Sequence, residues 1–127
     1  KIVVISGIGP GLGVKLAVEA AREGARGVVV AARTIDKLDD AEARIRALGV
    51  DCGVLKVKTD ITDRTQCRQL ATQAVERFGR IDALVNSAFV HGTFPEPVEE
   101  ADLDGWRAVF DTNVFGTMAL TQEVVPH

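Results

Sequence analysis

The sequence has 127 residues, of which 46% are hydrophobic and 26% are charged, and its formal net charge is −3. This composition is typical of one soluble globular domain, or of part of one. The acidic balance argues against a nucleic-acid-binding protein, and no apolar run reaches the roughly 18 residues that a membrane-spanning helix needs. We therefore expect neither a nucleic-acid partner nor a membrane partner.

Apolar, β-branched runs alternate along the chain with helical periodicity, which predicts a parallel α/β sheet with crossover helices. The expected strands are residues 1–6, 27–32, 52–58 and 81–86, and the expected helices are residues 11–24, 35–48, 63–78 and 102–124. The continuous apolar run at 27–32 is typical of a strand buried on both faces. The alternation at 52–58, with Lys56 and Lys58 pointing outward, indicates an edge strand.

Right-handed crossovers between these strands predict the strand order 3-2-1-4, the first half of a doubly wound (Rossmann) sheet. Gly24 and Gly49 are placed to end the first two helices, and Thr62-Asp63 is placed to begin the third. Residues 88–101 are irregular, and the last helix is expected to kink near Gly116. The whole of residues 1–127 is interpreted as a single domain or a portion of one.

The two cysteines, Cys52 and Cys67, lie in different predicted elements and do not form a metal-type cluster. A disulfide scaffold is not expected in a chain this apolar. We predict ordinary packed thiols, no metal site and a reducing, cytoplasmic location. Lys1 leads directly into the first strand without the long apolar region of a signal peptide.

A glycine-rich run, Ser6 to Gly13, joins the first strand to the first helix. A helix N-terminus leaves backbone N–H groups unpaired and carries partial positive charge, so it attracts phosphate. Glycines allow a sharp turn and a close approach of the backbone to a ligand. A tight turn with nothing bound is the alternative, but four glycines within the run exceed what a turn requires. We predict a pyrophosphate-binding loop made by Ser6, Gly7, Pro10, Gly11, Leu12 and Gly13.

The spacing Ser6-Gly7-x-x-x-Gly11-x-Gly13 resembles the Thr-Gly-x-x-x-Gly-x-Gly signature of the short-chain dehydrogenase/reductase family. Later segments resemble the same family in the same order, so that the resemblance covers essentially the whole chain. It implies an NAD(P)-dependent oxidoreductase that moves hydride between the nicotinamide and a small carbonyl compound or secondary alcohol. It also implies a homo-oligomer, a dimer or a tetramer.

Arg33 ends the second strand, where dinucleotide folds meet the adenosine ribose. An acidic residue at this strand end favours NAD, whereas an arginine accommodates the 2′-phosphate of NADP. Ala32 stands where the acid would be, so the sequence favours NADP, and NAD remains the alternative. Lys37, one helical turn on, is a second candidate contact. Solvated surface cations are the other interpretation of both residues.

The resemblance assigns further cofactor contacts to the ends of the third and fourth strands. It implies that the Asp60 carboxylate accepts from the adenine amino group and that Ile61 forms an apolar wall, although Asp60 is also placed to cap the next helix. Asn86-Ser87-Ala88-Phe89 resembles the family's Asn-Asn-Ala-Gly motif, which implies that Asn86 and Ala88 steady the sheet and line the ribose.

Two residues depart from the family's pattern. Pro10 lacks the backbone N–H that a cofactor oxygen would accept. If the family glycine at position 89 adopts a positive φ, Phe89 is strained there; its ring is otherwise expected to shape the substrate pocket or simply to pack. His91 is expected to be exposed to solvent, and Trp106 and Phe110 are expected in a core or an interface.

Asn113 lies inside the last predicted helix, where asparagine is a poor helix former. The segment Asn113-Val114-Phe115-Gly116 resembles the family's Asn-Val-x-Gly segment. The resemblance implies that Asn113 is the catalytic asparagine, which holds a water that links the catalytic lysine to solvent. A polar residue on a helix surface is the alternative.

The sequence contains no tyrosine. The family resemblance requires a catalytic serine and a Tyr-x-x-x-Lys pair, in which the tyrosine is the general acid/base. We therefore expect these residues to be the cofactor-binding, N-terminal portion of a longer chain. Two other functions stay open: a non-catalytic dinucleotide-binding module or redox sensor, and an adenosyl-methionine methyltransferase, against which Arg33 and the Asn113 segment count.

Overall fold

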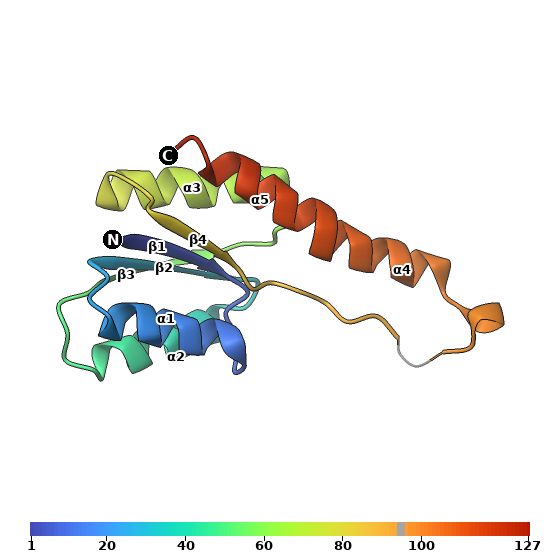
Figure 1. Cartoon of the computed structure of the whole chain (residues 1–127), viewed down its shortest axis with the longest axis horizontal. Helices are drawn as coiled ribbons and strands as arrows, with labels where there is room; N and C mark the ends of the chain where they lie inside the picture. Colours follow the sequence, from blue (N-terminus) through green and yellow to red (C-terminus); the bar gives the residue numbers. More distant parts are fainter. Residues whose placement is uncertain (94–95) are drawn as a thin grey trace.

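A computed structural model describes residues 1–93 and 96–127 of the chain. Four parallel strands form one sheet in the order β3-β2-β1-β4, which confirms the predicted order. Helices cover both faces of this sheet, as Figure 1 shows. The strands are β1 (Ile2–Ser6), β2 (Gly27–Ala32), β3 (Gly53–Lys58) and β4 (Ala83–Asn86).

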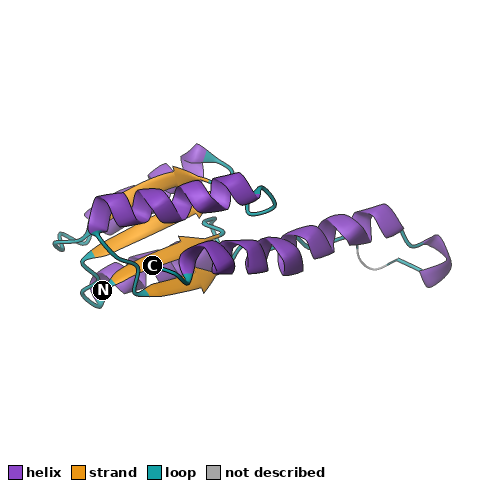
Figure 2. Cartoon of the chain, turned by 90° about the horizontal axis from the view of Figure 1, so that it is seen from above, coloured by secondary structure: helices purple, strands orange, loops and turns teal. Residues whose placement is uncertain are grey.

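The helices lie within a few residues of their predicted bounds. They are α1 (Leu12–Arg22), α2 (Ile35–Arg46), α3 (Arg64–Phe78), α4 (Leu103–Phe110) and α5 (Thr117–Val124), with a 3-10 turn η1 (Val98–Glu100) and a π-helical segment η2 (Asp111–Gly116). Helices α1 and α2 cover one face of the sheet, and α3 and α5 cover the other (Figures 1 and 2). In the irregular stretch 88–101, residues 94 and 95 lie outside the described part of the chain.

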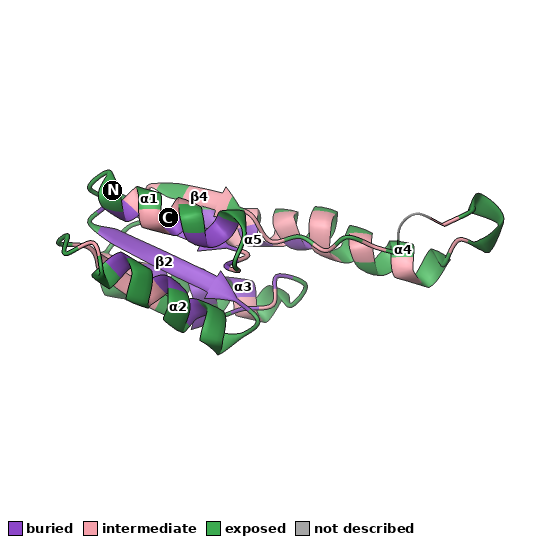
Figure 3. Ribbon diagram, turned by 90° about the horizontal axis from the view of Figure 1, so that it is seen from below, coloured by how far each residue is buried: buried purple, intermediate pink, exposed green. Residues whose placement is uncertain are grey.

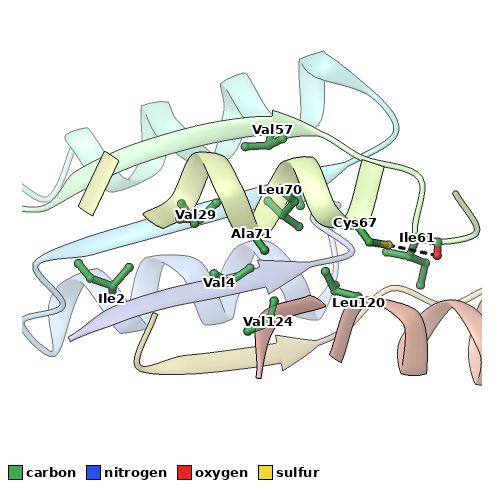
Figure 4. Packing of buried hydrophobic residues seen from close by; sticks show 12 residues of the cluster. Ile2, Val4, Val29, Val57, Ile61, Cys67, Leu70, Ala71, Leu120 and Val124 are labelled. Carbon is green, nitrogen blue, oxygen red and sulfur yellow. Dashed lines mark hydrogen bonds between the residues drawn. The ribbon is translucent and has the colours of Figure 1, made fainter. Parts of the chain in front are cut away.

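The core has two halves, one on each face of the sheet, because successive residues of a strand point to opposite sides. All of β2 is buried, as predicted for a central strand. Val29 belongs to the cluster on the α3 and α5 face, with Leu70 and Leu120 (Figure 4), whereas Val30 belongs to the cluster on the α1 and α2 face, with Leu38. This two-sided burial fixes the ends of the strands, where the loops described below begin.

Strand β3 forms one edge of the sheet, as predicted. Val57 is buried, whereas Lys56 and Lys58 are exposed. The ammonium of Lys56 lies 2.8 Å from a carboxylate oxygen of Asp39 on α2. Cys52 precedes the strand instead of belonging to it, because β3 begins at Gly53.

The predicted helix-end signals are confirmed. Asp63 is the N-cap of α3, and its side chain accepts hydrogen bonds from the backbone N–H groups of Thr65 and Gln66. Gly24 and Gly49 follow α1 and α2 with φ values of +82° and +67°, a conformation that glycine adopts without strain.

The long C-terminal helix is interrupted by η2, which ends at the predicted kink position, Gly116. A Cβ atom on Gly116 would lie 3.0 Å from the carbonyl oxygen of Ile61, so glycine allows the helix to pass close to this loop. Helix α4 extends away from the sheet and has no buried residue (Figure 3). Of the two positions predicted for Trp106 and Phe110, the core is excluded, since both are about half exposed, and the interface stays a prediction.

Candidate functional site

A cleft of about 600 Å³ lies at the carboxyl ends of the four strands. The loops after β1, β2, β3 and β4 form it, and η2 adds Thr112. The chain runs from β1 outward to β3 on one side and then returns to β4 on the other side of β1. Open α/β sheets bind ligands at such a point of reversal, and the volume is typical of a small-molecule site.

Every residue predicted to bind the cofactor lines this one cleft. They are Ser6, Gly7, Pro10, Gly11, Leu12, Gly13, Arg33, Asp60, Ile61, Asn86 and Ala88. These residues come from four separate loops, so the fold brings together what the sequence separates. Asn113, the predicted catalytic residue, is not among the lining residues.

The glycines of the first loop divide into two kinds. Gly7 has a φ of +78°, and a Cβ atom on it would lie 2.2 Å from the backbone nitrogen of Ala88; a Cβ on Gly13 would lie 2.3 Å from the carbonyl oxygen of Gly7. These two glycines are needed for the fold itself. Around Gly9 and Gly11 an added Cβ would meet nothing within 4 Å. The packing of this chain does not require glycine at these two positions.

The open glycines lie where α1 begins. Gly11 is the N-cap of α1, and no side chain caps this end of the helix. The first-turn N–H groups of α1 therefore lack the side-chain acceptor that Asp63 provides for α3. An uncapped helix start beside two unobstructed glycines is suited to an anionic ligand that approaches the backbone closely.

Two cations line the cleft at the end of β2. Arg33 and Lys37 are both exposed, and among the described residues neither has an ion pair or a side-chain hydrogen bond within the protein. Ala32, at the position where an acidic residue would favour NAD, is buried. This end of the cleft therefore carries positive charge that no carboxylate of the described chain neutralises by direct contact.

Asp60 is held at the end of β3 by local hydrogen bonds. Its Oδ1 accepts from the backbone N–H of Thr62 at 3.0 Å and from the hydroxyl of Thr62 at 2.7 Å. Because Asp63 caps α3, Asp60 does not play the capping role that the sequence also allowed. Ile61 is buried against the core and lines the cleft as well.

At the end of β4, hydrogen bonds hold the two residues that precede Ala88. The Ser87 N–H donates to the Ser6 carbonyl at 3.2 Å, which joins this loop to β1. The side-chain amide of Asn86 donates to the hydroxyl of Thr121 on α5 at 3.1 Å. Asn86 thus ties the sheet to a covering helix while the residue also lines the cleft.

Asn113 acts on the same loop from the π-helical segment. Its side chain accepts from the N–H of Val90 at 2.9 Å and donates to the carbonyl of Val90 at 2.8 Å. Its neighbour Thr112 lines the cleft, and the sequence interpretation missed it. Thr59 was also missed, although it directly follows β3 and the strand-end rule already pointed there.

Phe89 lines the cleft with 70% of its surface exposed. No described non-glycine residue has a positive φ, so Phe89 does not adopt the conformation in which it would be strained. His91 is exposed, as expected.

Cys67 is excluded as a nucleophile by its surroundings. It is fully buried beneath the cleft, and its thiol donates to the carbonyl of Ile61 at 3.4 Å (Figure 4). Burial raises the pKa of the Cys67 thiol to about 11, so the reactive thiolate is scarce at neutral pH. In residues 1–93 and 96–127, no three His, Cys, Asp or Glu side chains gather where they would hold a metal ion.

None of the helices in the described residues combines the length and the apolar character that crossing a bilayer requires.

Comparisons with known proteins match this geometry. The family model for short chain dehydrogenases matches residues 1–127. The chain belongs to the short-chain dehydrogenase family. It is 38% identical to 11-beta-hydroxysteroid dehydrogenase A of Sesamum indicum, with 100% of this chain and 36% of the relative covered. It is 32% identical to L-fucose dehydrogenase of Bos taurus, with 100% and 44% covered.

Solved structures of short-chain dehydrogenases and reductases superpose closely on the chain. Levodione reductase gives a TM-score of 0.93 at 30% identity, covering 99% of this chain and 48% of that one. An actinorhodin polyketide ketoreductase variant solved with NADPH gives 0.86 at 28% identity, covering 98% and 46%. The chain thus spans about half the length, or less, of the curated relatives and solved structures named here.

Proposed function

We propose that this chain forms the cofactor-binding half of an NADP(H)-dependent oxidoreductase. The reaction would transfer hydride between the nicotinamide and a carbonyl compound or secondary alcohol. The observation that carries the proposal is the pair Gly9 and Gly11, which the packing does not require and which leave the backbone beside the α1 N-terminus open. The dehydrogenase and reductase names of the relatives support the same reaction class.

The residues of the cleft fit a dinucleotide along its length. The glycine loop would hold the pyrophosphate through backbone N–H groups, and Asp60 would accept from the adenine amino group. Asn86 and Ala88 would line the second ribose. The nicotinamide supplies the hydride acceptor or donor when the cofactor is bound.

A preference for NADP over NAD is part of the proposal. It rests on Arg33 and Lys37, which line the cleft without an ion pair or side-chain hydrogen bond to any described residue, and on Ala32 at the position where NAD enzymes have an acid. A guanidinium binds phosphate oxygens in a bidentate manner and stacks on a planar base. The structural neighbour solved with NADPH supports the choice.

The proton-transfer residues are proposed to lie outside these 127 residues. The chain has no tyrosine, and it spans about half of its relatives or less. Asn113 is the one catalytic residue that we assign here, and it would hold a water that links the catalytic lysine to solvent. We also propose a homo-oligomer, because α4 presents exposed apolar side chains such as Leu103 and Phe110.

Calorimetric titration of the full-length protein tests the proposal. NADPH should bind most tightly, NADH more weakly, and S-adenosyl-methionine not at all. Hydride transfer from NADPH to a panel of ketones, followed by the loss of reduced nicotinamide absorbance, then separates an enzyme from a binding module. Binding of neither dinucleotide would overturn the proposal, and binding without turnover of any carbonyl would favour a redox sensor.

A further inference from the structure

We propose that Phe89 is a ligand-contacting residue that holds the nicotinamide half of the dinucleotide through its aromatic ring. This inference deepens the proposed function and rests on it. The motif that this chain otherwise resembles has glycine at position 89, so the contact would be a property of this chain. The side chain lines the cleft, yet 70% of it is exposed, so the protein itself leaves most of the ring uncovered.

The backbone on both sides of Phe89 is fixed. Ser87 is bound to β1 through the Ser6 carbonyl, and Val90 is bound through both of its backbone groups to Asn113. Only two residues, Ala88 and Phe89, separate these anchors. Ala88 is itself packed against Gly7, because a Cβ there would overlap its backbone. The ring therefore leaves a rigid loop at a defined place in the cleft.

The order of the strands decides which half of the ligand this ring meets. The glycine loop follows β1, which lies between β2 and β4 in the sheet. A dinucleotide whose pyrophosphate lies on this loop must extend one nucleoside toward β2 and the other toward β4. Arg33 and Lys37 make the β2 side the side for the phosphorylated adenosine. The nicotinamide half is then directed toward β4, where Phe89 lies.

An aromatic ring at this place suits the flat ring of a nicotinamide, in the oxidised or the reduced form. Aromatic side chains prefer offset-stacked or edge-to-face contacts, and these contribute beyond the area that they bury. A rigid loop also limits the side-chain entropy lost on binding, since only the ring torsions must be ordered. Removing the ring should therefore lower the affinity for the whole dinucleotide about three- to tenfold. The affinity for a ligand that has only the adenosine half should not change.

The experiment compares two ligands on the full-length protein. NADPH and 2′,5′-ADP, which lacks the nicotinamide half, are titrated into wild type and the variants Phe89→Ala, Phe89→Leu and Phe89→Tyr. We expect Phe89→Ala to lower the affinity for NADPH and to leave the affinity for 2′,5′-ADP unchanged. Phe89→Tyr should bind NADPH as tightly as wild type does, and Phe89→Leu should have an intermediate affinity. Phe115→Ala is the matched control, because Phe115 is similarly exposed, at 64% against 70%, but is not among the residues that line the cleft.

The outcomes separate this inference from the function on which it rests. If wild type binds both ligands and Phe89→Ala leaves NADPH affinity unchanged, Phe89 does not contact the nicotinamide half. An equal loss of affinity for both ligands in Phe89→Ala would also overturn the inference, because it would indicate a general disturbance of the cleft. If wild type binds neither ligand, the proposed function itself is wrong.

Discussion

The side-chain amide of Asn113 hydrogen-bonds both backbone groups of Val90: it accepts from the N–H at 2.9 Å and donates to the carbonyl at 2.8 Å. The asparagine belongs to a π-helical segment and the valine to the loop after β4. A residue that is unfavourable inside a helix thus satisfies both backbone groups of a partly buried loop residue. This pairing fixes the wall of the cleft that carries Ala88 and Phe89.

Replacing Asn113 with leucine should destabilise the protein. Two partly buried backbone groups of Val90 would lose their partners, and an unsatisfied group costs roughly 1–3 kcal/mol. Asn113→Asp should also destabilise, since a carboxylate accepts from the Val90 N–H but repels its carbonyl. Urea unfolding measures both changes. Asn86→Ala, which removes one exposed hydrogen bond to Thr121, is the control and should cost less; an equal loss in all three would contradict the assignment.

In the glycine loop, we expect some substitutions to affect the stability of the fold and others to affect dinucleotide binding. Gly7→Ala and Gly13→Ala should lower the free energy of unfolding strongly, because the new Cβ would overlap backbone atoms at 2.2 and 2.3 Å. Gly9→Val and Gly11→Val have open space around the Cβ, so stability should fall much less, Gly11→Val by the roughly 1 kcal/mol that loss of a preferred N-cap residue costs, while dinucleotide affinity falls. Thermal unfolding and NADPH titration of the same four proteins check this. Intact NADPH binding in both valine variants would show that the loop does not hold the pyrophosphate.

Most of the architecture follows from patterns that act over short distances. The apolar run at 27–32 announces a strand buried on both faces, and Asp63, Gly24 and Gly49 mark helix ends through hydrogen bonds or φ values set by their immediate neighbours. The strand order then follows from the handedness of the crossovers. The cleft could be predicted for the same reason, since parallel strands bring their carboxyl ends to one edge.

The features that the sequence did not predict depend on contacts between distant segments. The side chain of Asn113 in the π-helical segment hydrogen-bonds Val90, and no residue of the helix itself predicts this partner. The division of the glycines into two kinds depends on Ala88, far along the chain from Gly7. The backbone conformation of Phe89 could not be predicted either, because hydrogen bonds to Ser6 and Asn113, both distant in the sequence, anchor its loop.

Arg33 should decide the choice between the two dinucleotides. Arg33→Asp places a carboxylate where the 2′-phosphate of NADP would lie and where it can accept from the ribose hydroxyls of NAD. We expect NADPH to lose at least about tenfold in affinity relative to NADH, a change of about 1.4 kcal/mol. Lys37→Ala is the companion variant and should shift the ratio less. Unchanged titrations in Arg33→Asp would refute its role as the phosphate-binding residue.

Cys67 should make the stability of the protein depend on alkaline pH. Its folded pKa is raised to about 11 by burial, whereas a thiol in the unfolded chain titrates near pH 8.5. The unfolded state therefore loses the proton first, and the stabilisation present below about pH 8.5 is lost as the pH rises toward 11. Unfolding measured from about pH 8 to pH 10 should show wild type losing about 2 kcal/mol more than Cys67→Ala. Parallel pH profiles would mean that the thiol ionises in the folded protein, and rapid labelling of native Cys67 by a thiol reagent would show the same directly.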